Sequence, residues 1–340
     1  MLSGPPGGGS MDDRGLQEET YRLLRQVPRG RVTSYGALAE ALGAIEASRL
    51  VGHYMAINPY APEVPCHRVV HSDGRLGRFS SPRGPERKAE MLQEEGVRVE
   101  RGRIVDFDKV MFRDLWGDRP LARLREYQLS LLPRLRLADG REPYSSLVAV
   151  DVAYTDLGAF AAGALQGLKE GRPGPTASIH VAAPFPYIPT FLGFREIPAI
   201  KALLDSLVRR PDLLLVDGNG TLHPRGIGYA CQAGVELDIP TIGVAKSLLC
   251  GEVERPPAGV GDASPVVVDG EVRGHALRLS NGKRGVVYVS PGHLVSPRRA
   301  LEITGGLVAG RTVGPLLRAH LAAREAAASF KSGRPVAGLP

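Results

Sequence analysis

The stretch that most constrains this chain is LLLVDGNGTLHPRG, residues 213–226, in which an apolar run ends in a carboxylate. Four apolar residues before Asp217, bounded by Pro211 and Gly218, predict a short buried strand. In an open α/β sheet, ligands bind where such strands end. Taken alone, an aspartate that merely caps the following helix explains the stretch equally well.

A second apolar run, SSLVAVDVAY, carries Asp151 within it and predicts a central strand of the same sheet. An unpaired buried carboxylate is costly, so Asp151 needs hydrogen-bond donors or a cation. Asp151 and Asp217 together suit a hard divalent cation such as Mg2+, because that ion prefers carboxylate oxygens. The two strands therefore favour a ligand site over a helix cap.

The length of 340 residues predicts two domains, because single hydrophobic cores stop growing below that size. A charged, mixed segment after Phe112 places the boundary there. The first ten residues, MLSGPPGGGS, have the low complexity of a flexible tail. We therefore expect a tail over 1–13, a first domain over 14–111, a second over 112–330 and a short tail over 331–340.

Composition limits the partners and the compartment. The 43 Lys and Arg residues against 36 Asp and Glu give a net charge of +7, which favours a nucleic-acid partner but also fits an ordinary solvated surface. Three cysteines are too few for a disulfide framework, which predicts a reducing compartment. No apolar run approaches the length of a membrane span and the start does not read as a signal peptide, so we expect a cytoplasmic protein without a membrane partner.

The first domain begins with helical patterns over 16–27, 34–43 and 46–57. Two short helices joined by a turn that contains Gly43 predict a helix-turn-helix, whose second helix can enter a DNA groove. Many helical pairs that bind nothing share this pattern, so the periodicity alone favours a purely structural pair.

The segment VPCHRVVHSDG places Cys66 beside His67. A thiol becomes nucleophilic when a neighbouring imidazole stabilises the thiolate. Adjacent residues of an extended chain point apart, so such a contact requires a turn at this place. For the dipeptide alone, a buried inert thiol is the simpler interpretation.

The motifs TSYG, ASRLVG, PCHRV and EEG occur in order between Val27 and Phe112, and this segment resembles the active-site domain of O6-alkylguanine-DNA alkyltransferases and the related alkyltransferase-like proteins. The resemblance implies that a target base is flipped out of the duplex, which is necessary because a stacked base cannot reach a buried thiol. It also implies a role for each matching residue: Cys66 accepts the alkyl group, His67 and Glu95 relay its proton through water, Tyr35 rotates the target phosphate, Arg49 fills the gap left by the base, and Asn58 braces the recognition helix and the cysteine loop.

Several alternatives stay open for this domain. The same residues fit simpler roles: Tyr35 as a side chain that packs on a helix face, and Arg49 as a side chain that binds a DNA phosphate. The segment GPERKAEMLQEEGVRVERGRIVDF is closer to the alkyltransferase-like proteins, which bind alkylated guanine but lack the cysteine. Because Cys66 is present, we expect single-use transfer, with lesion recognition without transfer as the alternative.

In the second domain, PFPYIPTFLGFRE surrounds Tyr187 with prolines and predicts a stiff aromatic tip. Such a tip can separate stacked bases, or it can cover a core. Lys246 follows the predicted strand PTIGVA and could stabilise a phosphoryl group, although surface lysines are far commoner.

The motifs VAVDVAYTD, PYIPTFLGFREIP, LLLVDGNGTLHPRGIGYA, IPTIGVAKSLL and VSPGHLVS occur in the order found in endonuclease V, which residues 112–330 resemble. The resemblance implies an RNase H-like mixed sheet flanked by helices. The fold expected for the whole chain is therefore α/β, with an N-terminal helix-turn-helix (winged-helix-like) domain and a C-terminal RNase H-like domain. The implied site comprises metal carboxylates Asp151, Glu196 and Asp217, supporting catalytic residues Lys246 and His293, and DNA-binding residues Tyr187, Leu192, Gly218 and His223, with Mg2+ as cofactor and Mn2+ as an alternative.

Together the two resemblances imply a bifunctional DNA repair protein that acts on double-stranded DNA. The expected lesions are O6-alkylguanine for the first domain and deoxyinosine for the second, with inosine in RNA as the alternative substrate of the nuclease. A structure-specific nuclease of the same fold and a metal-free binding domain are the other candidates, and the latter is disfavoured because three ionised carboxylates repel one another without a cation. Thr190 stands where the family typically has glycine, which leaves the base preference open.

Overall fold

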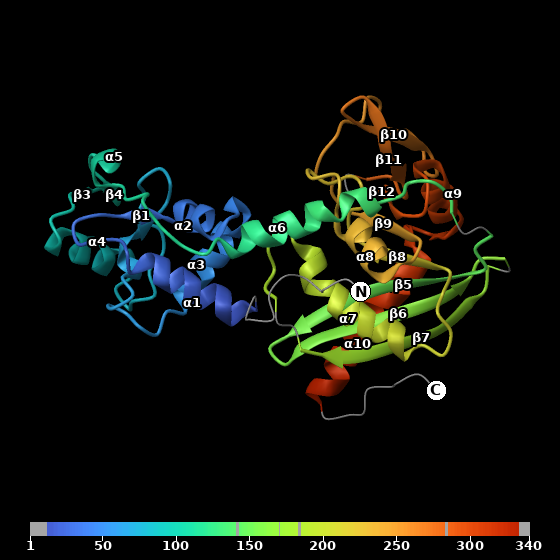
Figure 1. Ribbon diagram of the computed structural model, residues 1–340, viewed down its shortest axis with the longest axis horizontal. Helices are drawn as coiled ribbons and strands as arrows, with labels where there is room; N and C mark the ends of the chain where they lie inside the picture. The colour runs from blue at the N-terminus through green and yellow to red at the C-terminus, as the bar shows by residue number, and fades with distance from the viewer. Residues whose placement is uncertain (1–11, 141–142, 170, 183–184, 283–284, 333–340) are drawn as a thin grey trace. The chain divides into compact units, whose positions relative to one another are not determined.

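The structure, a computed structural model, describes residues 12–140, 143–169, 171–182, 185–282 and 285–332 (Figure 1). The tails predicted over 1–13 and 331–340 fall mostly outside these residues. Contacts between Cα atoms divide the chain into two compact units, 12–127 with 185–189, and 128–332 without that segment. The units therefore separate after Tyr127, whereas the sequence placed the boundary near residue 112.

The first unit is mainly helical, with two short strand pairs among the residues described. Its helices are α1 (Asp13–Leu24), α2 (Tyr35–Leu42), α3 (Ser48–Ala56), α4 (Gly84–Glu94) and α5 (Phe107–Val110), and α6 (Pro120–Ser130) runs across the division. Its strands are β1 (Thr33–Ser34) paired in parallel with β2 (Val69–Val70), and β3 (Val99–Glu100) paired with β4 (Arg103–Ile104). An isolated parallel bridge joins Val32, just before β1, to Met111, just after α5.

Local chemistry explains the helix-turn-helix. Ser34 caps α2 by accepting a hydrogen bond from the amide of Ala37, which satisfies an amide that the first helical turn leaves unpaired. Gly43 ends α2 at a φ of 105°, a left-handed conformation that glycine adopts without strain. A Cβ at Gly43 would also lie 2.3 Å from the amide nitrogen of Ala122, so no other residue fits there.

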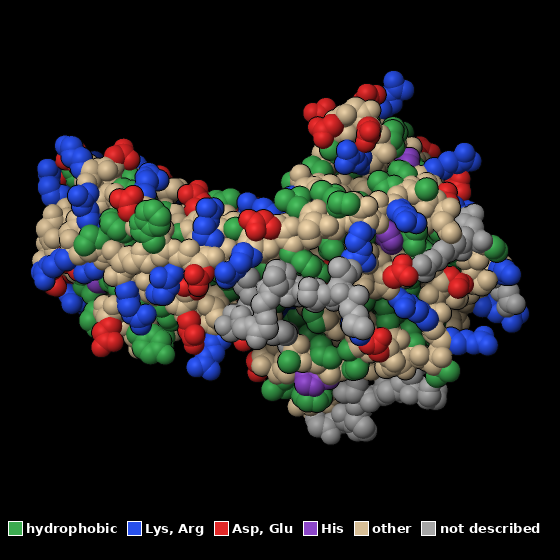
Figure 2. Space-filling view, in the orientation of Figure 1, with side chains coloured by type: hydrophobic (Ala, Val, Ile, Leu, Met, Phe, Trp, Pro, Cys, Tyr) green, Lys and Arg blue, Asp and Glu red, His purple; other side chains and the backbone are tan. Residues whose placement is uncertain are grey.

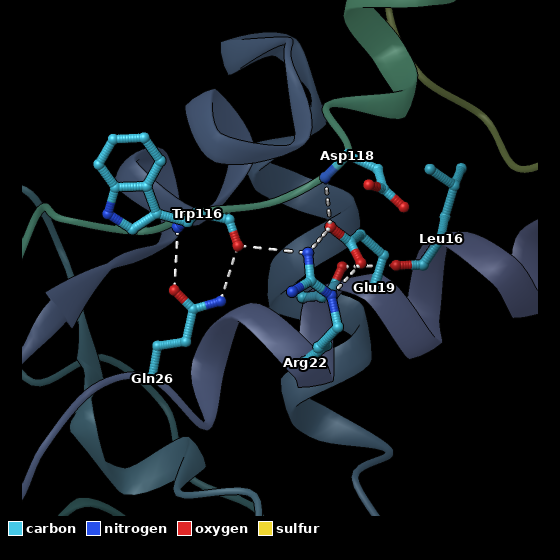
Figure 3. Close-up of polar contacts among 7 residues, drawn as sticks. Leu16, Glu19, Arg22, Gln26, Trp116 and Asp118 are labelled. Carbon is cyan, nitrogen blue, oxygen red and sulfur yellow. Dashed lines mark hydrogen bonds and ion pairs between the residues drawn. The ribbon is translucent and has the colours of Figure 1, made fainter.

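A segment of residues 113–119, which we call the strap, explains why the first unit extends beyond residue 112. The side-chain amide of Gln26 accepts from the nitrogen of Trp116 at 2.9 Å and donates to its carbonyl at 2.8 Å. The amide of Asp118 donates to Glu19 at 3.0 Å. Figure 3 shows Glu19 of α1 and Gln26, two residues beyond the end of that helix, reaching the strap. The charged composition of the segment resembles a linker, but these long-range bonds attach it to α1 and to the residues that follow it.

The second unit is built on one mixed sheet of eight strands in the order β10-β11-β12-β9-β8-β5-β6-β7. The strands are β5 (Ser146–Thr155), β6 (Gly158–Gly167), β7 (Pro173–Val181), β8 (Leu213–Asp217), β9 (Thr241–Ala245), β10 (Ala263–Val268), β11 (Glu271–Arg278) and β12 (Val286–His293). Strands β5, β8 and β9 run parallel to one another at its centre, and the remaining pairings are antiparallel.

Helices cover both faces of this sheet, as the expected RNase H-like fold requires (Figure 1). Val148 and Val150 of β5 pack in one core with α7 (Leu192–Ser206) and α8 (Tyr229–Leu237). The alternate residues Leu147 and Ala149 pack in a second core with α9 (Pro297–Gly306) and α10 (Gly314–Lys331). A strand that is buried on both faces reads as a continuous apolar run, which is how β5 and β8 appear in the sequence.

The small hairpin of β13 (Val308–Ala309) and β14 (Thr312–Val313) links α9 to α10. Within the described ranges, no helix is long and apolar enough to cross a membrane.

Candidate active sites of the two units

Cys66 opens a single 3-10 turn, Cys66–Arg68, that follows Pro65. This turn supplies the bend that a Cys-His pair requires. The thiol is 8% exposed, and the neighbouring His67 is also buried. His67 Nε2 lies 3.0 Å from Glu95 Oε1, while Arg68 donates to the same carboxylate at 2.9 and 2.6 Å. The structure thus places His67 and Glu95 in contact, and Cys66 precedes His67 in the same turn.

The surroundings of His67 keep its imidazole neutral, which is the state that can accept a proton. Burial works to raise the pKa of Glu95, but hydrogen bonds from Arg68 and His67 outweigh it and hold that pKa at about 2. Burial lowers the pKa of His67, with Glu95 opposing the shift. At neutral pH the cluster therefore contains an ionised Glu95 and a neutral imidazole, which can donate one ring N–H to the carboxylate and accept a proton at its other nitrogen.

Lys88 is a buried residue near Cys66 that the sequence reading missed. Its Nζ is enclosed and donates to the carbonyls of Val69 at 2.5 Å and Leu76 at 2.6 Å. Burial lowers the pKa of Lys88 to about 8, and a negative charge on Cys66 would raise it. The available signal was its spacing of four residues from Leu92, which places both on the buried face of α4.

The expected DNA-binding residues of this unit lie on and beside the helix-turn-helix. Tyr35 is the first residue of α2, and Arg49 is exposed at the start of α3. Asn58 donates to the carbonyl of Val64 at 2.9 Å and accepts from the amide of Tyr60 at 3.0 Å. Asn58 therefore connects the end of α3 to the segment that leads into Cys66, as a brace would.

In the second unit, Asp151 and Asp217 lie side by side on neighbouring parallel strands. Val150 of β5 pairs with Val216 of β8, so each aspartate is the next residue after a register pair. Adjacent strands are about 4.8 Å apart, which brings the two carboxylates close together. They lie where the parallel strands β5, β8 and β9 approach their C-terminal ends, a border of the sheet that we call the carboxylate edge. Lys246 follows β9 at the same edge, and its Nζ lies 2.6 Å from Asp217 Oδ2.

Each of the three expected metal carboxylates has its own polar neighbour. Asp217 is paired with Lys246, Asp151 lies 2.7 Å from His320 Nδ1, and Glu196 lies near the hydroxyl of Tyr229. Burial raises the pKa of Glu196 to about 8; the hydrogen bond from Tyr229 opposes this shift, while the charges of Asp151 and Asp217 add to it. The carboxylates therefore lie close enough to repel one another.

Oxygen donors of this kind suit a hard divalent cation, and their mutual repulsion is what such a cation would relieve. In the part of the chain that the structure describes, however, no three His, Cys, Asp or Glu side chains are already gathered as a set of metal ligands. Asp151, Glu196 and Asp217 would have to turn from their present donors toward a shared ion.

The structure does not bring His293 to these carboxylates. His293 pairs with Thr241 at the start of β9, whereas Asp217 pairs with Val244 three residues farther along. Three residues at about 3.3 Å each separate the two positions along the strands, and β9 lies between β12 and β8. His293 is therefore more than roughly 10 Å from Asp217, toward the opposite ends of the parallel strands. It is buried, and its Nδ1 accepts from the amide of Arg136 at 3.3 Å. The reason is strand direction: β12 runs antiparallel to β9, so its last residue reaches the edge where β9 begins.

His320 of α10 is the histidine at the carboxylate edge, and the sequence reading missed it. It lies in an alanine-rich helix, RAHLAAREAA, that carries no recognisable site motif. The one signal in the sequence was a single histidine within this alanine-rich helix. The structure shows that its side chain is half-exposed.

The expected DNA-binding residues of the second half occupy different settings. Tyr187 is 62% exposed, whereas Leu192 is partly buried as the first residue of α7. Gly218 is buried beneath Tyr229, and a Cβ on it would lie 2.7 Å from the tyrosine ring. His223 is buried in the loop after β8; burial and Arg225 lower its pKa to about 4, so it is neutral at physiological pH.

Thr190, the departure from the family pattern, has a φ of 69°. This left-handed conformation disfavours a β-branched residue. Its carbonyl accepts a hydrogen bond from Arg225, whose guanidinium also lies 4.8 Å from the centre of the Phe191 ring.

Comparison with known proteins matches both units. Residues 130–321 match the family described as Endonuclease V, and residues 15–97 match 6-O-methylguanine DNA methyltransferase, DNA binding domain. The chain is 36% identical over 304 residues to a bifunctional methyltransferase/endonuclease of Thermoplasma volcanium, covering 88% of this chain and 89% of the relative. A protein of the same description from Picrophilus torridus is 35% identical over 71% of this chain and 77% of its own length.

Solved structures support the fold of the second unit. Endonuclease V from Streptomyces avermitilis superposes with a TM-score of 0.56 at 34% identity, covering 61% of this chain and 92% of that one. A variant of Ciona intestinalis endonuclease V, in complex with a 23mer DNA containing an inosine followed by a ribo-adenosine, superposes with a TM-score of 0.55 at 25% identity and covers 63% of this chain and 99% of that one.

Proposed function

Since this chain belongs to the family of bifunctional methyltransferase/endonucleases, we propose that it repairs double-stranded DNA by two separate reactions. In the first, Cys66 takes an alkyl group once from O6-alkylguanine. In the second, the RNase H-like unit nicks the strand on the 3′ side of deoxyinosine with Mg2+. The turn that joins Cys66 to the His67–Glu95 pair carries the first proposal, and the carboxylate edge around Asp217 carries the second.

The alkyl transfer uses the proton acceptor beside the thiol. As the Cys66 proton moves toward His67, the sulfur attacks the alkyl carbon and the bond from that carbon to guanine O6 breaks. The proton lost by the thiol ends on the dealkylated guanine, which stays in the DNA strand, so the atoms balance. Glu95 stays ionised and stabilises the imidazolium while it carries the proton. The thioether has no partner that could reverse it, so each molecule acts once.

Protein mass tests this reaction. Incubation of the full chain with excess duplex carrying O6-methylguanine should add one methyl group, and Cys66→Ala should add none while still binding the duplex. An unchanged mass of the wild type would place the unit among proteins that recognise the lesion without transfer. Arg49→Ala should weaken lesion binding in either case, and unchanged affinity would refute its role as the residue that replaces the flipped base.

In the nuclease, Asp151, Glu196 and Asp217 would hold Mg2+, which when bound neutralises phosphate charge and activates a water. The other residues prepare the substrate. Lys246 lies at the same edge and can stabilise charge on a phosphate oxygen, and His320 orients Asp151. Tyr187 is exposed and braced by prolines, so it can act as the wedge that separates base pairs at the lesion. We expect the nick one phosphodiester beyond the 3′ bond of the lesion, leaving a 3′-hydroxyl and a 5′-phosphate.

Strand length tests this reaction. Wild type should nick a deoxyinosine duplex with Mg2+ and not with chelator, while Asp217→Ala should lose orders of magnitude in rate and still transfer methyl groups through Cys66. Equal nicking by Asp217→Ala, or no effect of chelator, would refute the site. The inosine-DNA complex of the Ciona protein motivates the substrate, and its ribo-adenosine motivates a second candidate. Matched strands with deoxyadenosine or ribo-adenosine after the inosine distinguish DNA from RNA preference.

A further inference from the structure

Gln128 of α6 is a buried side chain at the centre of a hydrogen-bond network in the second unit. It is 1% exposed. Its Oε1 accepts from Arg225 Nε at 2.7 Å, and its Nε2 donates to Gln232 Oε1 at 3.1 Å. Gln232 is also 1% exposed and donates in turn to Glu236 Oε1 at 2.9 Å. This Gln128 network therefore runs from Arg225, in the loop after β8, to Glu236 on α8.

The two ends of the network fix the orientation of both amides. A guanidinium can only donate, so the Gln128 atom that faces Arg225 must be the oxygen, and its nitrogen is left to donate to Gln232. A carboxylate at the other end can only accept, so Gln232 presents its nitrogen to Glu236. Turning either amide over would break two hydrogen bonds in a buried place, where unpaired polar groups are costly. The network therefore holds one arrangement.

The network supports one segment of the proposed DNA-binding residues at two points. Arg225 donates to the carbonyl of Thr190, just before α7. A Cβ on Gly193 would lie 2.4 Å from Gln232 Oε1, so the first turn of α7 packs directly on that amide. Leu192, which the resemblance assigns to DNA binding, lies between these two points in the sequence.

We propose that Gln128 is a positioning residue of the nuclease, which keeps the start of α7 in the shape that accepts deoxyinosine and thereby sets binding and selectivity rather than the rate of strand cleavage. The inference rests on the nuclease function proposed for the second unit. Because Gln128 is buried, it acts through Arg225 and Gln232 and not by touching DNA. Its hydrogen bond to the charged Arg225 is the stronger of the two, so its loss should matter most.

Gln128→Met and Gln128→Glu separate the acceptor from the bulk of the side chain. Methionine fills a similar space but cannot pair with Arg225, whereas glutamate keeps an acceptor for it. With the full chain and saturating Mg2+, Gln128→Met should raise the KM for a deoxyinosine duplex about tenfold or more and reduce the preference over an undamaged duplex by a similar factor, while kcat stays within about threefold of wild type. Gln128→Glu should bring KM back to within about threefold of wild type. A merely structural role would lower the fraction of active protein, which reduces the apparent kcat and leaves KM unchanged.

Gln166→Met is the matched control. Gln166 is a buried glutamine near the end of β6, beside the start of β5 and away from the carboxylate edge, and it donates to the carbonyl of Gly167 at 3.2 Å. This variant should keep the wild-type KM and selectivity.

Arg225→Lys provides a second route to the same answer, because lysine keeps the charge but lacks the fork that bridges Gln128 and Thr190. It should reproduce the loss of affinity, and it decides the question if Gln128→Met does not fold. Wild-type KM and selectivity in Gln128→Met or in Arg225→Lys, no recovery in Gln128→Glu, or an equal loss in Gln166→Met would refute the positioning role. If wild type does not nick deoxyinosine duplexes, the nuclease proposal itself fails, and the positioning role fails with it.

Discussion

At the scale of single residues, the cysteine site depends on the balance of charges around His67. The imidazole accepts a proton only while it is neutral, and burial favours that state by lowering its pKa. Glu95 acts in the opposite direction, since its negative charge and hydrogen bond raise the pKa of His67. The pH dependence of alkyl transfer should reveal both influences.

The first prediction concerns this pH dependence. Single-turnover methyl transfer should stay level as the pH falls from 8 to the usual histidine value of about 6.5, and decline only below it, because His67 protonates at a lower pH than an exposed histidine. Glu95→Gln removes an influence that raises the pKa, so the decline should move to lower pH, while the rate at neutral pH falls about 10- to 100-fold. Glu94→Gln, a substitution of the neighbouring exposed glutamate, should change neither. A decline that moves to higher pH in Glu95→Gln would contradict this assignment.

A second prediction concerns Thr190. The left-handed backbone costs a β-branched residue about 1–2 kcal/mol, and its hydroxyl is buried without a hydrogen-bond partner among the described residues. These costs exceed the roughly 0.5–1 kcal/mol of chain entropy that glycine adds to the unfolded state. Thr190→Gly should therefore stabilise the second unit by about 1 kcal/mol, seen as about fivefold slower hydrogen exchange of β5 and β8 amides. Thr190→Ala keeps the Cβ and should give less than this, whereas faster exchange in the glycine variant would refute the strain.

At the scale of elements, the loop after β8 depends on close approach to β12. The amide of Gly220 donates to Ser290 Oγ at 2.9 Å, and a Cβ on Gly220 would lie 2.0 Å from the carbonyl oxygen of Pro291. Backbone atoms of a central strand cannot move aside cheaply. This glycine therefore allows the loop that begins at Asp217 to pack on the sheet.

The third prediction tests this approach. Gly220→Ala should destabilise the second unit by at least about 1–3 kcal/mol, the usual cost of overpacking, and should speed hydrogen exchange of β8 amides accordingly. Gly282→Ala is the control, because a Cβ there meets nothing within 4 Å. Equal exchange rates for the two variants would show that the loop yields more readily than its contacts indicate.

At the scale of the whole molecule, surface charge does not distinguish the two units, and the first unit extends beyond residue 112. On the face drawn in Figure 2, basic and acidic side chains intermingle over both units, so the excess of basic residues does not by itself mark a nucleic-acid interface. The strap belongs to the first unit because Glu19 of α1 and Gln26 just after it bind its backbone, and the side chain of Trp116 is left 79% exposed.

The fourth prediction concerns the strap. Gln26→Ala removes the two hydrogen bonds that Gln26 makes to the backbone of Trp116 and leaves the one from Arg22. Cleavage by chymotrypsin after Trp116 should become about 30-fold faster, since each lost bond contributes about 1 kcal/mol to keeping the strap attached. Gln93→Ala changes an exposed glutamine on α4 and should leave cleavage at the wild-type rate. Cleavage of wild type and Gln26→Ala at equal rates would show that the strap is attached by other contacts.

The sequence by itself determined the two-part α/β organisation and the positions of Cys66, Asp151 and Asp217, because apolar periodicity and residue order are local properties. Short-range chemistry also predicted the end of α2 at Gly43. The sequence also showed that Thr190 stands where the family typically has glycine. Only the fold shows that this position has a left-handed backbone, which is why glycine suits it better.

Tertiary structure alone decided the long-range relations. It brought His320 rather than His293 to the carboxylate edge, because the direction of β12 and the packing of α10 are set by pairing between distant segments. It buried Lys88 near Cys66 and attached the strap to Gln26, a residue just after α1 and ninety residues away in the sequence. Such contacts depend on how separate elements meet, a property that no local pattern of residue types records.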